Sequence, residues 1–377
     1  MIDNRQYGPL SRALHHVAFN PKFGGIPIQR RLSELEESLF ARDIAAAAYV
    51  DQPVFVAGLP RAGTTLILTL LAQVPEFAAH TYRDMPFVMA PLLWSRLSGP
   101  FQQTSESRER AHGDGMSVGY DSPEAFEEVI WKAFWPGKFQ PSFIEPWQAD
   151  DRQPEFETFL RHHAEKLVAA RARDARRAGT APPTRYLSKN NANIARLDLL
   201  PAIFPNCRIV IPIRAPEDQI RSLMRQHERF SDLHARDAFA RQYMSWIGHH
   251  EFGGDLRPIR FDRDKQSIHS VENPGEAFWT DQWLRAHREI LKPSPHKVLL
   301  DFEELRHDPW GSLTSLAQAL ELADPQALVA GADQVKAPDL ARPESPRTSE
   351  VETLYAQARA LCINAPGRGR HDLRAAE

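Results

Sequence analysis

A loop with the residue types of a phosphate-binding turn lies near the start of the chain. It reads Gly58-Leu-Pro-Arg-Ala-Gly63-Thr-Thr. A phosphate or sulfate group needs several convergent N–H donors and close backbone approach, and a glycine-flanked turn at a helix N-terminus supplies both. The two glycines have the spacing of a nucleoside triphosphate loop, but Thr64 stands where the lysine of such a loop is expected. Arg61 is a permanent cation within the loop, which suggests charge neutralisation without a metal.

The segments around this loop predict the elements that position it. The short apolar run at 54–57 indicates a buried parallel strand, and the mostly apolar stretch at 64–74 indicates a helix packed on the sheet. Further strands are predicted at 185–188, 208–213 and 297–301, and further helices at 124–134, 156–177, 194–204, 217–226, 239–248, 276–291 and 309–320. This alternation predicts an α/β fold with three layers around a central parallel sheet.

A second pair of candidate anion-binding residues follows the strand at 208–213. Arg214 comes directly after that strand, and Ser222 lies eight residues further on, within the next predicted helix. An arginine at this position can also pair with a carboxylate such as Glu217. Because parallel strands end at the same edge of a sheet, we expect Arg214 to lie at the same edge as the first loop.

The first loop resembles that of the sulfotransferases that use 3′-phosphoadenosine 5′-phosphosulfate (PAPS), and its arginine is typical of their tyrosylprotein-type and bacterial members. The matching residues are Pro60, Arg61, Ala62, Gly63, Thr64, Thr65 and Leu66. The resemblance implies that residues 61–66 bind the 5′-phosphosulfate, with Arg61 next to the bridging oxygen and hydroxyl groups of Thr64 and Thr65 on the 5′-phosphate. It also implies that Arg214 and Ser222 bind the 3′-phosphate. The product would then be 3′-phosphoadenosine 5′-phosphate (PAP), and the overall fold would be of the P-loop type.

Sulfuryl transfer needs a base for the acceptor proton and cations for the leaving group. The resemblance implies that Lys189 lies near the sulfuryl oxygens. Cytosolic relatives have a histidine base two residues later, but this chain has Asn191, which accepts no proton near neutral pH. Tyrosylprotein-type and bacterial relatives use a carboxylate after the loop helix, which implies Asp84, and partial burial would raise its pKa for that role. His80 and His112 are the reserve candidates.

Two other functions fit parts of the sequence. Asp301, which ends the predicted strand at 297–301, mimics the magnesium-binding aspartate of a nucleotide kinase or NTPase. A nucleotide-sensing protein without turnover is the other alternative. The cluster His249-His250-Glu251 has the residue types of a metal site, but adjacent residues on a helix point in different directions. We therefore interpret that cluster as a candidate lining of the acceptor site, and we expect no metal.

The domain organisation follows from these motifs. We predict a helical N-terminal lead-in over 1–52, a sulfotransferase domain over 53–325 and a C-terminal extension over 326–377. Within the domain, segments 85–150 and 227–290 are expected to shape the acceptor pocket. The acceptor would carry a hydroxyl or amine, and a small molecule, carbohydrate, lipid or peptide would fit equally well. Arg342 and Arg347 could return to the 3′-phosphate from the C-terminal extension.

The composition restricts the cellular compartments and the binding partners that fit this sequence. The 377 residues carry a formal charge of −3, so no overall field would attract nucleic acid or an anionic membrane. The two cysteines, Cys207 and Cys362, are far apart and without metal-like spacing, which suits a reducing compartment. No apolar run approaches the roughly 20 residues that a transmembrane helix needs. We expect a cytoplasmic protein that binds no nucleic acid, for which a homodimer is one assembly to consider.

Overall fold

A computed structural model describes residues 9–46, 51–98, 108–109, 117–118, 122–261, 274–337 and 348–365 of the chain. Five parallel strands within these residues form one sheet, in the order β2-β5-β1-β6-β7. Its strands are β1 (Val54–Val56), β2 (Phe77–Ala79), β5 (Arg185–Lys189), β6 (Arg208–Ile213) and β7 (Lys297–Asp301). Two short strands, β3 (Arg108–Glu109) and β4 (Ser117–Val118), pair separately and antiparallel.

Helices account for most of the other described elements. The α-helices are α1 (Pro9–Phe19), α2 (Gly25–Leu39), α3 (Ala41–Ala46), α4 (Thr64–Leu71), α5 (Pro91–Leu97), α6 (Glu128–Phe134), α7 (Pro154–Ala178), α8 (Leu199–Ile203), α9 (Pro216–Arg236), α10 (Ala238–Trp246), α11 (Glu276–Ile290), α12 (Phe302–His307), α13 (Pro309–Ala319), α14 (Pro325–Val329) and α15 (Ser349–Leu361). Short 3-10 helices are η1 (Pro21–Phe23), η2 (Tyr82–Asp84), η4 (Pro136–Lys138), η5 (Asn191–Ala195), η6 (Gly253–Asp255) and η7 (Ala330–Gln334).

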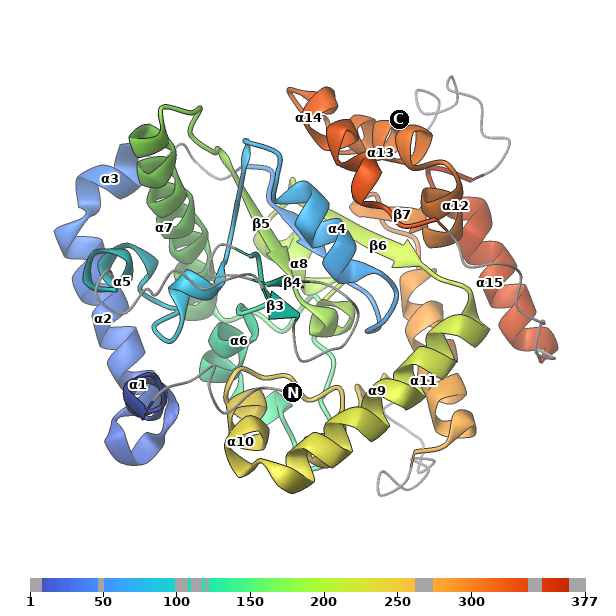
Figure 1. The fold of residues 1–377 in the computed structure, drawn as a ribbon, viewed down its shortest axis with the longest axis horizontal. Coiled ribbons are helices and arrows are strands. Elements are labelled where there is room, and N and C mark those ends of the chain that lie inside the picture. Colours follow the sequence, from blue (N-terminus) through green and yellow to red (C-terminus); the bar gives the residue numbers. More distant parts are fainter. Residues whose placement is uncertain are drawn as a thin grey trace.

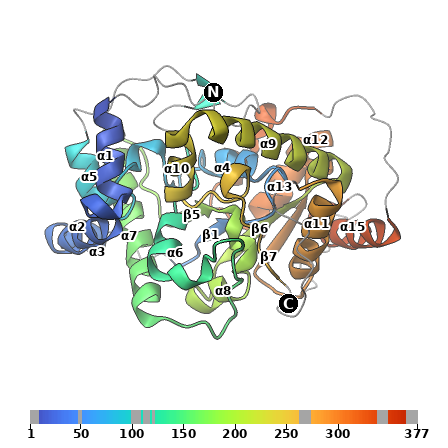
Figure 2. The same cartoon turned by 90° about the horizontal axis from the view of Figure 1, so that it is seen from below.

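Helices cover both faces of the sheet, as Figures 1 and 2 show. Side chains of a strand point alternately to opposite faces. Val54 and Val56 of β1 therefore pack with α4, α13 and α14, whereas Phe55 packs with α7 and α8 on the other face. All three side chains are fully buried. The predicted α/β fold with three layers around a parallel sheet is confirmed.

Most predicted elements are present, with two informative differences. Strand β2 was not predicted, because its three residues, Phe77–Ala79, include none of the β-branched types that indicate a strand. The single helix predicted over 194–204 is wrong, since η5 and α8 occupy this stretch with Arg196 between them. Arg196 is fully buried and forms an ion pair with Glu128, at 2.7 Å between Nη1 and Oε2. That distant partner, rather than local helix propensity, decides the backbone path here.

Three of the helices, α1 to α3, lie within the first 52 residues, where a helical segment was predicted. At the other end of the chain, residues after α15 return to the sheet. The backbone N–H of Ile363 donates to the carbonyl oxygen of Leu299 in β7, at 2.9 Å. The boundaries predicted for the domain and its two extensions stay a prediction.

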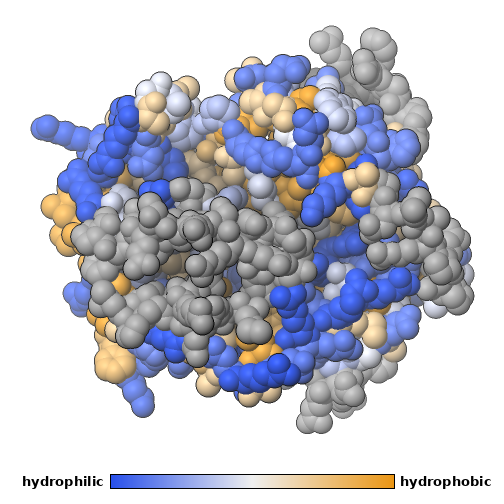
Figure 3. Space-filling view, viewed as in Figure 1, coloured by the Kyte–Doolittle hydropathy of each residue, from blue (hydrophilic) through white to orange (hydrophobic). Residues whose placement is uncertain are grey.

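The surface differs from this interior. Among the coloured residues of the face in Figure 3, hydrophilic ones predominate and hydrophobic ones appear in small separate patches. None of the helices among the described residues combines the length and the apolar character needed to cross a membrane.

The turn before α4 contains a glycine that no other residue can replace without strain. Gly63 has φ of 102°, and a Cβ added there would lie 2.4 Å from Cε2 of Phe302. We expect Gly63→Ala to lower the free energy of unfolding by at least about 1 kcal/mol, because L-residues resist this backbone conformation. Urea denaturation measures the loss. Gly137→Ala is the matched control, since its new Cβ meets nothing within 4 Å; an equal loss in both variants would contradict this explanation.

Candidate nucleotide and acceptor site

The candidate site lies where β1, β5 and β6 end. The backbone N–H of Ala57 donates to Val210 O of β6 at 3.0 Å, and that of Asn190 donates to Val56 O of β1 at 3.1 Å. These bonds hold the first residues after β1 and β5 side by side. Figure 1 shows α9 and α10 on the side of the molecule to which the loop between β1 and α4 extends.

The two predicted anion-binding motifs are in direct contact. Arg61 Nε donates to Ser222 Oγ at 3.0 Å, and Arg214 Nη1 donates to the backbone oxygen of Arg61 at 2.7 Å. Residues separated by more than 150 positions thus meet across the sheet edge. The expectation that Arg214 lies at the same edge as the loop is confirmed. The loop places Arg61 itself in the left-handed region, with φ of 67°.

A glutamine outside the predicted motifs, Gln219, supports the loop. Gln219 Nε2 donates to the backbone oxygen of Pro60 at 3.1 Å, and its Oε1 accepts from the indole N–H of Trp283 at 3.1 Å. Gln219 and Trp283 are buried. Gln219 precedes Ser222 by three residues, so both side chains lie on one face of α9. That spacing was the signal available in the sequence.

Arg214 has more N–H donors than hydrogen-bond acceptors around it. Burial lowers its pKa, and the carboxylates of Glu303 and Asp218 oppose that effect, while the nearby cations Arg306 and Arg225 add to it. Its Nε atom is buried and meets no hydrogen-bond acceptor in the described part of the chain. An anion binding here would supply the missing acceptor and offset the repulsion among the arginines.

A chain of hydrogen bonds joins the loop helix to the segment after α10. Thr64, which begins α4, donates from Oγ1 to Oδ1 of Asn191 at 3.1 Å. Asn191 Nδ2 donates in turn to Glu251 Oε1 at 2.9 Å. Thr64 is buried, whereas Asn191 and Glu251 are partly exposed. A residue from the predicted acceptor segment 227–290 therefore reaches the loop through one amide group.

Lys189 ends β5 at the same edge. Its backbone pairs in parallel register with Val56, the last residue of β1, and its side chain is 6% exposed. The lysine thus starts from the strand next to the one that leads into the loop. The expectation that Lys189 lies near the sulfuryl oxygens stays a prediction.

Asp84, the predicted base, is held in a buried ion pair. Its Oδ2 accepts from the backbone N–H of Thr81 at 2.8 Å and from Arg171, and it lies 3.1 Å from Nδ1 of His80. Burial favours a higher pKa, but Arg171 and His80 outweigh burial and hold the pKa of Asp84 well below its usual range. The predicted raised pKa is therefore wrong. Such a carboxylate is a weak proton acceptor.

The histidine candidates have different environments. His80 is buried, and its Nε2 lies 2.8 Å from Nε2 of His163, whose pKa is lowered by burial and by the neighbouring His80. His112 lies outside the described residues. In the cluster at 249–251, His249 Nε2 faces the carbonyl oxygen of Ala125 at 3.2 Å, and burial and Lys132 lower the pKa of His250 to about 2. The three residues of that cluster point to different partners.

Asp301 is fully committed to contacts within the protein. Its Oδ1 accepts from the backbone N–H groups of Glu303 and Glu304 at 2.9 and 3.2 Å, as the N-cap of α12. Its Oδ2 accepts from Arg359 Nε at 2.5 Å. The carboxylate that mimicked a magnesium ligand in the sequence is thus a buried helix cap that also pairs with a partly exposed arginine. This arrangement does not favour the NTPase interpretation.

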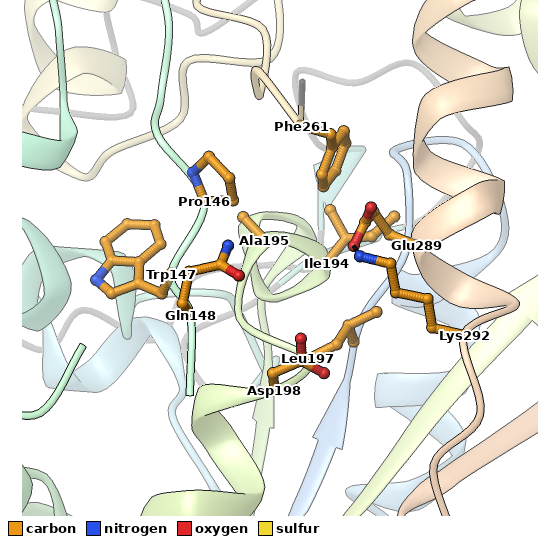
Figure 4. Close-up of a pocket in the computed structure, with 10 residues that line it drawn as sticks. All are labelled: Pro146, Trp147, Gln148, Ile194, Ala195, Leu197, Asp198, Phe261, Glu289 and Lys292. Atoms are coloured by element: carbon orange, nitrogen blue, oxygen red, sulfur yellow. Dashed lines mark hydrogen bonds and ion pairs between the residues drawn. The ribbon is translucent and has the colours of Figure 1, made fainter. Parts of the chain in front are cut away.

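A cavity of about 280 Å³ lies beside α8, away from the residues predicted to do chemistry. Figure 4 shows its lining, with the side chains of Gln148, Asp198 and Lys292 among those around the space. None of the predicted site residues lines it. Because the anion-binding contacts lie elsewhere, we place the candidate site at the loop before α4 and not in this cavity.

The Asp84–Arg171 pair generates a prediction about stability. Replacing Asp84 by Asn leaves Arg171 with no buried carboxylate, and breaking a buried pair in this way costs roughly 3–5 kcal/mol. The pKa of Asp84 is lower in the folded than in the unfolded chain, so its contribution is complete above the unfolded value of about 3.9 and is lost as the pH falls through the folded value. Urea denaturation should show the full difference from wild type at neutral pH.

Asp174→Asn is the matched control for this variant. Asp174 also contacts Arg171, at 3.8 Å, but its side chain is 53% exposed. We expect a change within about 0.5 kcal/mol. A similar loss of unfolding free energy in both variants would mean that the buried ion pair stabilises the fold no more than the exposed one.

Comparison with known proteins identifies the family. The model of a sulfotransferase family matches residues 53–326. Similar solved structures include sulfotransferase STF9 from Mycobacterium avium (16% identity, 85% of this chain and 79% of that one, TM-score 0.44) and STF1 from Mycobacterium tuberculosis H37Rv (15%, 88% and 82%, 0.40). The sulfotransferase domain of the Synechococcus PCC 7002 olefin synthase is another (13%, 82% and 94%, 0.35). A search of curated proteins gave no match. Because the family model matches most of the length of this chain, the chain belongs to the sulfotransferase family and is a sulfuryl-transferring enzyme.

Proposed function

We propose that the sulfuryl donor is PAPS and that the acceptor is a hydroxyl or amine. The observation that carries this proposal is the contact between the two anion-binding motifs, in which Arg61 reaches Ser222 and Arg214 reaches the loop backbone. A nucleotide with phosphate groups at both its 5′ and 3′ positions would place one group on each motif. The missing acceptor at Arg214 Nε and the cations nearby fit the 3′-phosphate.

The residues have distinct roles in this proposal. The loop from Arg61 to Leu66 binds the 5′-phosphosulfate, with the backbone of Ala62 and Gly63 close to the anion and the N-terminus of α4 favouring negative charge. Thr65 offers a hydroxyl group, and Thr64, whose hydroxyl donates to Asn191, offers its backbone N–H. During transfer the acceptor oxygen or nitrogen bonds to sulfur, the bond from sulfur to the bridging oxygen breaks, and PAP leaves with the electron pair.

Cations are needed where that negative charge develops. Arg61 lies in the loop itself, and Lys189 starts from the neighbouring strand end. We propose that Arg61 stabilises the leaving phosphate and that Lys189 contacts the sulfuryl oxygens. The acceptor pocket is formed, in this proposal, by parts of segments 85–150 and 227–290. Glu251, from the second segment, already reaches Asn191 beside the loop.

Replacing Arg214 tests the 3′-phosphate assignment. Arg214→Ala should weaken PAP binding at least tenfold more than AMP binding, because AMP lacks the 3′-phosphate and loses only the support that Arg214 gives the loop. Thermal shifts with each nucleotide measure both affinities. Arg177→Ala, which removes an exposed arginine from α7, is the control and should change neither. Equal losses for PAP and AMP would contradict the assignment.

Replacing Arg61 tests the role of the loop cation. Arg61→Ala should lower the rate of PAP release from PAPS at least a hundredfold, since it removes the charge next to the leaving group. Radiolabelled PAPS with a panel of a phenol, a primary alcohol, a hexose and a primary amine measures the rate and also tests the acceptor class. A wild-type enzyme that binds ATP with magnesium better than PAP would point instead to a phosphotransferase.

A further inference from the structure

The structure leaves the base for the acceptor proton to be found. Two carboxylates that contact β5 and the residues after it are engaged in the core. Glu128 binds Arg196 through both oxygens, and Glu127 accepts from Trp131 Nε1 at 2.8 Å and from the hydroxyl of Tyr186 at 2.7 Å. Both are buried. Such fully satisfied groups would have to break a buried contact before they could accept a proton.

Glu251 differs from these carboxylates. It is partly exposed, and its Oε1 accepts one hydrogen bond, from Asn191. Its Oε2 accepts no hydrogen bond from the residues that the structure describes. The side chain is thus fixed at one oxygen and available at the other. A general base needs this combination of a defined position and a free lone pair.

The position of Glu251 relative to the loop matches the reaction proposed above, on which this inference rests. The backbone N–H groups at the start of α4 would contact the 5′-phosphate, and Glu251 lies one amide group beyond the Thr64 hydroxyl, through Asn191. The sulfuryl group is one bridging oxygen beyond the same phosphate. An acceptor oxygen aligns about 3–3.5 Å beyond the sulfur before attack. In this arrangement Glu251 and the sulfuryl group would both lie near the phosphate that the loop binds.

We propose that Glu251 is the general base that removes the acceptor proton and that Asn191 is the residue that positions it. As the acceptor oxygen or nitrogen bonds to sulfur, its proton passes to Glu251 Oε2, while the bond to the bridging oxygen breaks and PAP departs. Asn191 cannot take the proton itself, because an amide is not basic at neutral pH. It holds the carboxylate by one hydrogen bond and the loop threonine by the other.

Kinetics of Glu251 variants test this role. Glu251→Gln keeps the shape of the side chain and should lower kcat at least a hundredfold with KM for PAPS within about threefold, as expected for loss of a base. Glu251→Ala should lose as much, and added formate should restore at least a tenth of the wild-type rate, because a small carboxylate can enter the vacated space. Rescue by formate is expected only if the lost function was proton transfer.

Glu352 supplies the matched control. It is an exposed carboxylate on α15, and Glu352→Gln and Glu352→Ala should keep the wild-type kcat with or without formate. Thermal shifts with PAP should be unchanged in all four variants, which shows that each protein folds and binds nucleotide. Wild-type turnover in Glu251→Gln, or loss in Glu251→Ala that formate does not restore, would overturn the inference alone. A wild-type enzyme that releases no PAP from PAPS with any acceptor would overturn the proposed function itself.

Discussion

The hydrogen bond from the guanidinium of Arg214 to the backbone oxygen of Arg61 connects the two halves of the site. It spans two strand-to-helix connections, one after β1 and one after β6, and so fixes the loop against α9. Gln219 adds a second bond to the same loop, at the oxygen of Pro60. With Arg61 in a left-handed backbone conformation, the loop depends on such external partners to keep its shape. The parallel sheet makes these contacts available, because its strands end at a common edge.

The sequence was most informative where structure is local. A strand, a glycine-flanked turn and an apolar helix are adjacent in the chain, so the loop at 58–65 and its flanking elements could be predicted from pattern alone. Arg214 and Ser222 are also separated by a short, regular interval. Their meeting with the loop followed from the general rule for parallel sheets, without any knowledge of individual contacts.

Prediction failed where a residue's distant partner belongs to no recognisable motif. Arg171, which lowers the pKa of Asp84, is 87 positions away from it, on α7. Glu128 and Arg196, which interrupt the helix predicted over 194–204, are separated by 68. Composition and periodicity carry no information on such pairs, and burial can raise or lower the pKa of a carboxylate depending on its partner. The role of a residue such as Asp84 therefore could not be predicted, because tertiary contacts decide its pKa.

The hydrogen bond from Arg61 to Ser222 has a consequence for how a ligand enters. The serine hydroxyl that would donate to one end of the nucleotide accepts a hydrogen bond from the side chain meant for the other end, and its own proton stays available for a phosphate. A dianion bound at the loop would compete with the serine oxygen for the Nε donor of Arg61. Exchanging one such bond for another changes the free energy little, since the net worth of each is about 1 kcal/mol. The resting enzyme thereby keeps both polar groups satisfied and can switch partners at low cost.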